Sequence, residues 1–278
     1  MPLSAQLSKL IGSGQESYYL VGLDQKGLNL PGVVRNMNYY EEVNIDIYDK
    51  TIACHPLIDA CNASIAYRLL EHFGIPCAGK SVLDAGAGSG QMCRFLKGIP
   101  GLIIEAIDVD PTTEDYFRRH PELKDVPFHC VDILVEDIPK HYDAIISRGV
   151  YHHVPKTDRP RFIKTLCEHA DLVIIADEGL SEYSTREERR RNCDGWYSFI
   201  IREARRREIV QLAELETEFW KHEYLETAED GGDFKESPTH FIEDAGRVGL
   251  VPASLDRIGP WKVGGGFFTA TFITNPSS

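Results

Sequence analysis

The feature that most constrains the fold is residues 82–90, where a short apolar stretch passes directly into closely spaced glycines. Asp84 ends the apolar stretch, and Gly86, Gly88 and Gly90 follow in a G-x-G-x-G pattern. Glycine permits backbone angles that other residues avoid and lets a ligand approach the main chain closely. A helix after the glycines would add free N–H groups at its first turn. The run therefore predicts a buried strand, a tight ligand-binding turn and a helix.

Apolar strand-like segments and helix-like segments alternate over the first two thirds of the chain. Strands are predicted at 81–84, 102–108, 128–132, 142–147 and 172–177. Helices are predicted at 56–73, 90–97, 113–119 and 159–169. Thr157 and Asp158 are both candidate N-caps of the last helix, and Pro160 suits its first turn. This alternation predicts a parallel sheet covered on both faces.

The alternation stops after the fifth strand. Residues 179 to about 230 are charged and helical in pattern, and a further helix is expected at 238–248. Segments 250–258 and 267–274 predict two strands, antiparallel because the glycine turn between them is too short for a crossover. We therefore expect an α/β, doubly wound sheet with an N-terminal helical cap and an inserted helical lobe. The expected divisions are a cap or lid at 1–78, a Rossmann-like core at 79–178, the lobe at 179–236 and a completing helix and strand pair at 237–278.

Composition limits the partners of the chain. Its 278 residues carry 30 Lys and Arg against 43 Asp and Glu, a formal net charge of −13. Such a chain repels a nucleic-acid backbone unless its basic residues are segregated, so we expect no nucleic-acid partner. Seven scattered cysteines without a C-x-x-C pair predict neither a disulfide framework nor a zinc site, and we expect no bound metal. We find no apolar run long enough to span a membrane, and we expect a cytoplasmic protein.

The acids around the glycines indicate the kind of ligand. The spacing differs from the dinucleotide pattern G-x-G-x-x-G. Asp84 stands two residues before the first glycine, where a carboxylate would repel a pyrophosphate but not the amino group and sulfonium of S-adenosylmethionine. Asp108, at the end of the second predicted strand, can accept both ribose hydroxyls. Asp132 ends the third and could accept from the adenine amino group.

Four segments carry a family resemblance. They are V-L-D-A-G-A-G-S-G at 82–90, A-I-D-V-D-P at 106–111, V-D-I at 131–133 and Y-D-A-I-I-S-R-G-V-Y-H-H-V at 142–154. In order and spacing the sequence resembles the class I S-adenosylmethionine-dependent methyltransferases over roughly residues 56–178. The first 50 residues and 179–236 match nothing that we can assign. The resemblance implies a seven-stranded sheet whose last strand is antiparallel.

The resemblance also implies which residues contact the cofactor. Asp110 competes with Asp108 for the ribose, and the family's apolar-acid-x-x-Pro pattern favours Asp108. A plain strand–helix turn or a solvated strand end is the alternative for these positions. The predicted cofactor contacts are Asp84, Gly86, Ala87, Gly88, Gly90, Asp108, Val109, Asp132, Ile133 and Ser147.

Catalytic candidates follow the fourth strand. Methyl transfer is an in-line displacement, so the enzyme mainly aligns the nucleophile, and a base helps only where the nucleophile must lose a proton. Tyr151, His152 and His153 lie close to where the family places the methyl group, and a histidine can act as a base near neutral pH. Packing and capping of the next helix is the alternative.

Substrate candidates are spread over three segments. Asp177 and Glu178 end the fifth strand, and either could hold a cationic substrate or take a proton, or else cap a helix. Tyr40, with Tyr39 and Tyr48, could belong to a lid. Trp196 and Tyr197 are candidates for a substrate wall, although their spacing favours the core of the lobe. Lys235 is predicted to be a solvated lysine, and the arginines of 186–207 to form a solvated helix face.

The function predicted is methyl transfer from S-adenosylmethionine to a small-molecule metabolite acceptor. One alternative is a non-methylating use of the cofactor, by intramolecular cyclisation or a sulfonium-assisted reaction. A NAD-dependent oxidoreductase and a non-catalytic binding module are the others. The expected partner is a small-molecule substrate, without nucleic acid or membrane.

Overall fold

The computed structural model describes residues 45–224 and 234–274. A single sheet runs through them, with strands in the order β3-β2-β1-β4-β5-β7-β6. The strands are β1 (Ser81–Ala85), β2 (Ile103–Asp108), β3 (Phe128–Cys130), β4 (Tyr142–Arg148), β5 (Ala170–Leu180), β6 (Ser254–Ile258) and β7 (Gly265–Ile273).

The direction of each strand follows from its connection. Strands β1 to β5 pair in parallel. Helices lie in the connections from β1 to β2, from β2 to β3 and from β4 to β5, whereas a loop of turns joins β3 to β4. Strand β7 pairs antiparallel with both β5 and β6, so it alone opposes the rest of the sheet. The expected seven-stranded, mostly parallel sheet with an antiparallel last strand is thereby confirmed.

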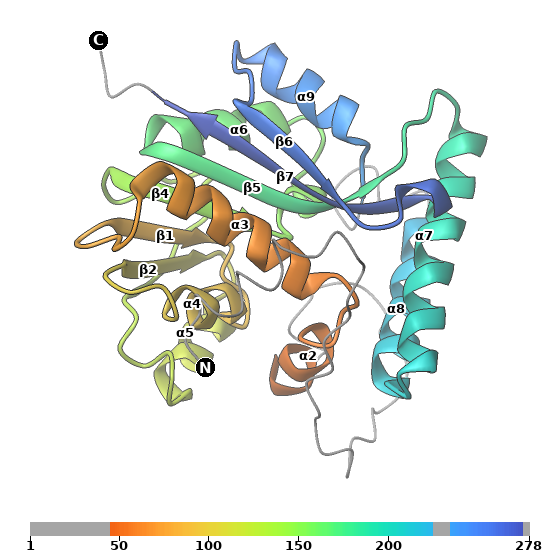
Figure 1. The fold of residues 1–278 in the computed structure, drawn as a ribbon, viewed down its shortest axis with the longest axis horizontal. Coiled ribbons are helices and arrows are strands. Elements are labelled where there is room, and N and C mark those ends of the chain that lie inside the picture. The colour runs from red at the N-terminus through yellow and green to blue at the C-terminus, as the bar shows by residue number, and fades with distance from the viewer. Residues whose placement is uncertain (1–44, 225–233, 275–278) are drawn as a thin grey trace. The chain divides into compact units, whose positions relative to one another are not determined.

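Helices cover both faces of this sheet. On one face lie α3 (Ile58–Phe73), α4 (Gln91–Leu96) and α5 (Pro111–Arg119), and on the other α6 (Arg159–Glu168) and α9 (Pro238–Arg247) (Figure 1). Both faces of β5 are therefore buried, which explains its almost unbroken apolar sequence.

Three further helices lie at the carboxyl ends of the parallel strands. They are α2 (Ile45–Ile52), α7 (Arg186–Arg206) and α8 (Val210–Tyr224), and the last two run side by side (Figure 1). The carboxyl ends of the parallel strands are where open α/β sheets bind ligands. These helices therefore stand over the expected site.

The region after β5 is helical, as its charged pattern predicts. It forms two helices, because Glu208 adopts a left-handed conformation with φ of +60° and ends the run. A capping box starts α7, where the Thr185 hydroxyl accepts the N–H of Glu188 and the Glu188 carboxylate accepts that of Thr185. The glycine break expected at 230–233 lies outside the described residues.

One smaller prediction was wrong at an element end, and another was confirmed in position only. Strand β3 stops at Cys130, so Asp132 stands in the following turn instead of at the strand end. Asp158 occupies the N-cap position of α6, but its side chain makes no capping bond and pairs with Arg161. Because Pro160 supplies no N–H, this helix has fewer donors for a cap to satisfy.

Within residues 45–224 and 234–274, no helix is long and apolar enough to cross a membrane. All seven cysteines are thiols. The same part of the chain holds no group of three His, Cys, Asp or Glu side chains arranged to bind a metal ion.

Candidate functional site

The glycine loop between β1 and α4 is held in one shape by its backbone. Gly86, Gly88 and Gly90 all have positive φ, at +80°, +49° and +70°. The N–H groups of Gly86 and Ala87 both donate to the carbonyl of Ile107, at 2.9 and 3.0 Å. A Cβ on Gly86 would lie 2.3 Å from the side chain of Val150, so that position requires glycine for space as well as for φ.

Asp108 closes this loop from the end of β2. Its Oδ2 accepts the Gly88 N–H at 2.7 Å, and its Oδ1 accepts the Asp110 N–H at 3.0 Å. Burial raises the pKa of Asp108, and these backbone bonds oppose that effect. Asp110 is already used as the N-cap of α5, where its carboxylate accepts the Thr112 N–H at 2.7 Å. Of the two acids, Asp108 is therefore the one at the loop.

The other predicted cofactor residues lie at different depths. Asp84 is 1% exposed and accepts the Cys93 thiol at 3.2 Å, and burial raises its pKa to about 6. Val109 is 63% exposed, an apolar side chain left open beside Asp108. The Asp132 carboxylate accepts the Leu134 N–H at 2.9 Å, and Ile133 packs against the core.

Ser147 is buried in β4, and among the described residues its hydroxyl has no hydrogen-bond partner. Its neighbour in the register of the sheet is Ile175, which belongs to the core under α6 and α9. Side chains in register on paired strands share a face, so the hydroxyl points into that core.

Helix α2 is fastened to the glycine loop by a residue that the sequence did not single out. One oxygen of the Asp49 carboxylate accepts both the Ser89 hydroxyl, at 2.7 Å, and the Arg94 guanidinium, at 2.6 Å. The Gln91 amide donates to the Asp49 carbonyl at 2.8 Å. An acid in an unassigned helix carries no motif, so only the tertiary structure reveals this link.

The end of β4 brings His152 against Asp177 of β5. His152 Nδ1 lies 2.5 Å from one Asp177 oxygen, and its backbone N–H donates to the other at 3.0 Å. Burial opposes ionisation of Asp177, but the charge and hydrogen bonds of His152 outweigh it and lower the pKa of Asp177. An ionised carboxylate accepts only, so it selects the tautomer that carries a proton on Nδ1 and a lone pair on Nε2.

The two neighbours of His152 have different surroundings. The Tyr151 hydroxyl donates to Asp244 of α9 at 2.5 Å, and its ring packs on Phe241 in the core. The His153 ring lies 3.9 Å from the ring of His152. The geometry thus favours His152 among the three predicted catalytic residues, and Tyr151 contacts the core instead of the strand ends.

Glu178 is surrounded by donors from three separate segments. The Trp196 indole N–H donates to its Oε2 at 3.0 Å, and the Lys235 ammonium lies 3.7 Å from the same oxygen. His55 Nε2 lies 3.7 Å from Oε1. The Lys235 ammonium also donates to the Tyr197 hydroxyl at 2.7 Å. The substrate candidates Glu178, Trp196 and Tyr197 therefore meet at one place.

Lys235 corrects a sequence-based expectation. It is 2% exposed, whereas the sequence favoured a solvated lysine. Arg189 of α7 corrects another, because it turns inward and donates to the Lys235 carbonyl at 3.1 Å instead of lying on a solvated face. Of the predicted lid tyrosines, Tyr48 lies in α2, and Tyr39 and Tyr40 fall outside the described residues.

His55 is a neutral donor in this cluster. Burial lowers its pKa to about 4, against the opposing effect of the Glu178 carboxylate. The Leu57 N–H donates to its Nδ1 at 3.4 Å, which places the ring proton on Nε2. Within the described residues that N–H has no hydrogen-bond partner.

The buried His55 should make stability depend on pH. A histidine has a pKa near 6.5 when unfolded, so the unfolded state gains a proton first as the pH falls from about 6.5 toward 4. We expect the unfolding free energy of the wild type to fall by about 3 kcal/mol relative to His55→Gln across that window. Urea unfolding at pH 7, 6, 5 and 4.5 measures the difference. Parallel curves for the two proteins would contradict it, and the exposed His72→Gln serves as the control.

The residues around the loop fit S-adenosylmethionine. Asp108 is an acceptor fixed by the Gly88 and Asp110 N–H groups, and a carboxylate has further lone pairs that can accept from ribose hydroxyls. The exposed apolar side chain of Val109 lies next to Asp108, where the adenine ring could pack against it. The loop itself presents backbone without side chains at Gly86 and Gly88, so a ligand can approach it closely.

Comparison with known proteins supports the same assignment. A family model described as a methyltransferase domain matches residues 62–224. A tRNA U34 carboxymethyltransferase from Geobacter sp. (strain M21) is 31% identical over 90 residues, covering 31% of this chain and 28% of that protein. A malonyl-[acyl-carrier protein] O-methyltransferase from Acetivibrio thermocellus is 32% identical over 71 residues, covering 25% of each chain. The matches thus span about a quarter of the length of these relatives.

Among solved structures, a DhpI-SAM-HEP complex superposes with a TM-score of 0.50 at 20% identity, covering 82% of this chain and 91% of that one. At this identity the likeness shows the fold alone. The named relatives act on different classes of molecule, so the acceptor has to be argued from the site.

Proposed function

Because the chain belongs to the methyltransferase domain family, we propose that it transfers a methyl group from S-adenosylmethionine to a small molecule bound at the ends of β4 and β5. The methyltransferase assignment replaces the oxidoreductase alternative. The observation that carries the proposal is the enclosed polar cluster around Glu178.

The burial of that cluster argues for a small acceptor. Trp196 and Tyr197 are 0% exposed, Lys235 is 2% and His55 is 4%. Side chains enclosed to this degree suit a small molecule, which can be surrounded on all sides, better than a nucleic acid or a folded protein. The net charge of −13 also disfavours a polyanionic partner.

The cofactor is proposed to lie along the glycine loop. Asp108 would hold the ribose, with Val109 and Asp132 toward the adenine and Gly86 to Gly90 along the remainder. Asp84 lies beneath the loop, where it supports Cys93 and the turn. When bound, S-adenosylmethionine supplies an electrophilic methyl carbon.

His152 is the residue proposed to take a proton from the acceptor. Asp177 orients its ring and favours the tautomer with the lone pair on Nε2, as a general base requires. Glu178, Lys235 and Tyr197 would position the acceptor from the neighbouring strand end and α7. In this proposal the enzyme aligns the nucleophile with the methyl group and takes up the proton that is released, which are the two requirements of the transfer.

The helices at this edge fall into two proposed roles. Helix α2, fastened to the loop by Asp49, belongs to the cap at 1–78. Helices α7 and α8 form the substrate lobe within 179–236. Seven thiols without a disulfide are in keeping with a reducing, cytoplasmic setting.

The acceptor class can be tested directly. Purified protein is incubated with methyl-labelled S-adenosylmethionine and, separately, with a small-metabolite extract, total tRNA and total protein. We expect label to enter the metabolite fraction, with release of S-adenosylhomocysteine. Label confined to tRNA or protein would overturn the small-molecule proposal, and methylthioadenosine as the product would indicate cyclisation of the cofactor.

A further inference from the structure

One short segment joins the two halves of the proposed acceptor site. Residues 234–237 run in extended form between α8 and α9, and each of the first three contacts a different element. The Phe234 N–H donates to the carbonyl of His152 at 3.0 Å. The carbonyl of Glu236 accepts the Leu180 N–H, at the end of β5, at 3.0 Å. The segment therefore reaches from the proposed base to the strand that carries Glu178.

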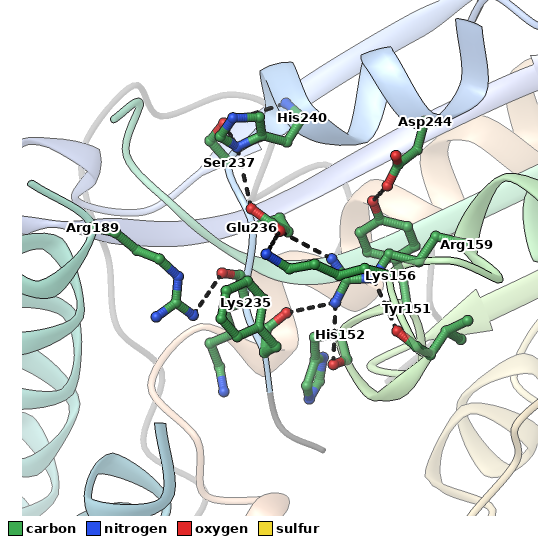
Figure 2. Close-up of polar contacts among 12 residues, drawn as sticks. Tyr151, His152, Lys156, Arg159, Arg189, Lys235, Glu236, Ser237, His240 and Asp244 are labelled. Atoms are coloured by element: carbon green, nitrogen blue, oxygen red, sulfur yellow. Dashed lines mark hydrogen bonds and ion pairs between the residues drawn. The ribbon is translucent and has the colours of Figure 1, made fainter. Parts of the chain in front are cut away.

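The Glu236 side chain is the anchor of this segment. It is 6% exposed, and donors from three different parts of the chain converge on it (Figure 2). Lys156 and Arg159 approach Oε1 at 3.1 and 3.3 Å, and His240 of α9 approaches Oε2 at 3.2 Å. The Tyr183 hydroxyl also donates to Oε2. Burial opposes its charge, yet these groups hold the pKa of Glu236 below its usual value.

The residues on either side of Lys235 are fixed as well. Arg159, 1% exposed, donates to the Phe234 carbonyl at 2.8 Å. The Arg189 guanidinium and the Lys156 ammonium lie over the Phe234 ring, at 3.6 and 3.7 Å from its centre. Arg189 donates in addition to the Lys235 carbonyl (Figure 2). A backbone held on both sides fixes the direction of the Lys235 Cα–Cβ bond, and the side chain extends from there to Tyr197 and Glu178.

We propose that Glu236 is a positioning residue, which locks residues 234–237 onto α6 and α9 and thereby holds Lys235 in the acceptor site. Glu236 itself does not contact the cluster around Glu178 in any contact that the structure describes. Its effect passes through the backbone of its neighbour. The inference rests on the proposed function only for what Lys235 does once it is held.

The placement of Lys235 can be tested without knowing the acceptor. Limited acetylation with acetic anhydride, followed by peptide mass spectrometry, reports how often each lysine ammonium is accessible. In the wild type, Lys235 should react slowly. Glu236→Ala should raise its rate about tenfold or more, because local opening then requires less free energy. The exposed Lys124 and Lys262 should react at unchanged rates and serve as internal standards.

Two further variants make the result decisive. Glu182→Gln removes a nearby exposed carboxylate that pairs with Arg257, and it should leave Lys235 protected. Glu236→Gln keeps the shape but removes the charge, so it should give an intermediate rate and remain folded. Unchanged labelling of Lys235 in Glu236→Gln, and in Glu236→Ala where that variant folds, would overturn the proposal.

Catalysis supplies a separate readout. With an acceptor identified, Glu236→Gln should raise the acceptor KM by about tenfold and leave the Kd for S-adenosylmethionine within about twofold of wild type. Lys235→Met tests the proposed function on its own. Full activity in Lys235→Met would remove Lys235 from acceptor binding and leave the labelling result on Glu236 standing.

Discussion

Asp108→Ala should raise the Kd for S-adenosylmethionine by about a hundredfold or more. The carboxylate is proposed to accept two ribose hydroxyls, and hydrogen bonds to a charged group contribute about 1.5–3 kcal/mol each. The same oxygens hold the Gly88 N–H and the Asp110 N–H, so the substitution also loosens the loop. Isothermal titration calorimetry of wild type and variant measures the change.

Asp110→Ala is the matched control, because it removes a carboxylate two residues away. Asp110 caps α5, so its loss should lower stability by about 1 kcal/mol. Its backbone N–H still donates to Asp108, and the Kd for S-adenosylmethionine should stay within about threefold of wild type. Equal loss of binding in both variants would contradict the assignment of Asp108 to the ribose. Wild-type affinity in Asp108→Ala would remove Asp108 from the cofactor site.

The sheet and its ligand edge could be predicted because their signals are local. Position 86 requires glycine because its φ is positive and because the side chain of Val150 leaves no room for a Cβ. A strand that turns sharply into a helix imposes this conformation. The middle of strand β5, residues 172–176, is apolar because both of its faces are buried. Alternation of such strands with helices leaves few topologies. The same logic placed Asp108 at the end of β2.

The surroundings of Glu178 could not be predicted, because they are assembled from distant segments. Lys235 stands next to a charged, glycine-containing stretch, and that local context favours exposure. Its burial depends on Glu236, which finds its partners on α6 and α9 and in the turn before α7. No spacing rule connects residues so far apart. The contacts of Asp49 with Ser89 and Arg94 could not be predicted for the same reason.

From the sequence, either Asp177 or Glu178 could hold a substrate, take a proton or cap a helix, and the structure pairs Asp177 with His152. The geometry of a strand explains why the two acids differ. Side chains alternate between the faces of a strand, so Asp177 and Glu178 point in opposite directions. One reaches the turn after β4, and the other reaches α7 and His55. Two adjacent acids thus serve two separate parts of the site.

Asp177→Asn should lower kcat by about a hundredfold to ten-thousandfold while leaving cofactor binding intact. An asparagine amide that donates to His152 Nδ1 would move the ring proton to Nε2, so the histidine would lose the lone pair that a base needs. His152→Gln removes the base itself and should cause a comparable loss. Release of S-adenosylhomocysteine with the identified acceptor measures kcat, and calorimetry with S-adenosylmethionine checks that each variant is folded and binds.

His153→Gln is the control that decides which histidine acts. The His153 ring lies against the ring of His152. The Asp177 carboxylate lies within hydrogen-bond distance of the Nδ1 of His152. The proton transfer is assigned to His152, whose Nδ1 faces the Asp177 carboxylate, so His153→Gln should change kcat by about threefold or less. If His153→Gln lost as much activity as His152→Gln, the assignment of the proton transfer to His152 would be contradicted. Full activity in both His152→Gln and Asp177→Asn would mean that the acceptor reaches the methyl group already deprotonated, and that alignment alone drives the transfer.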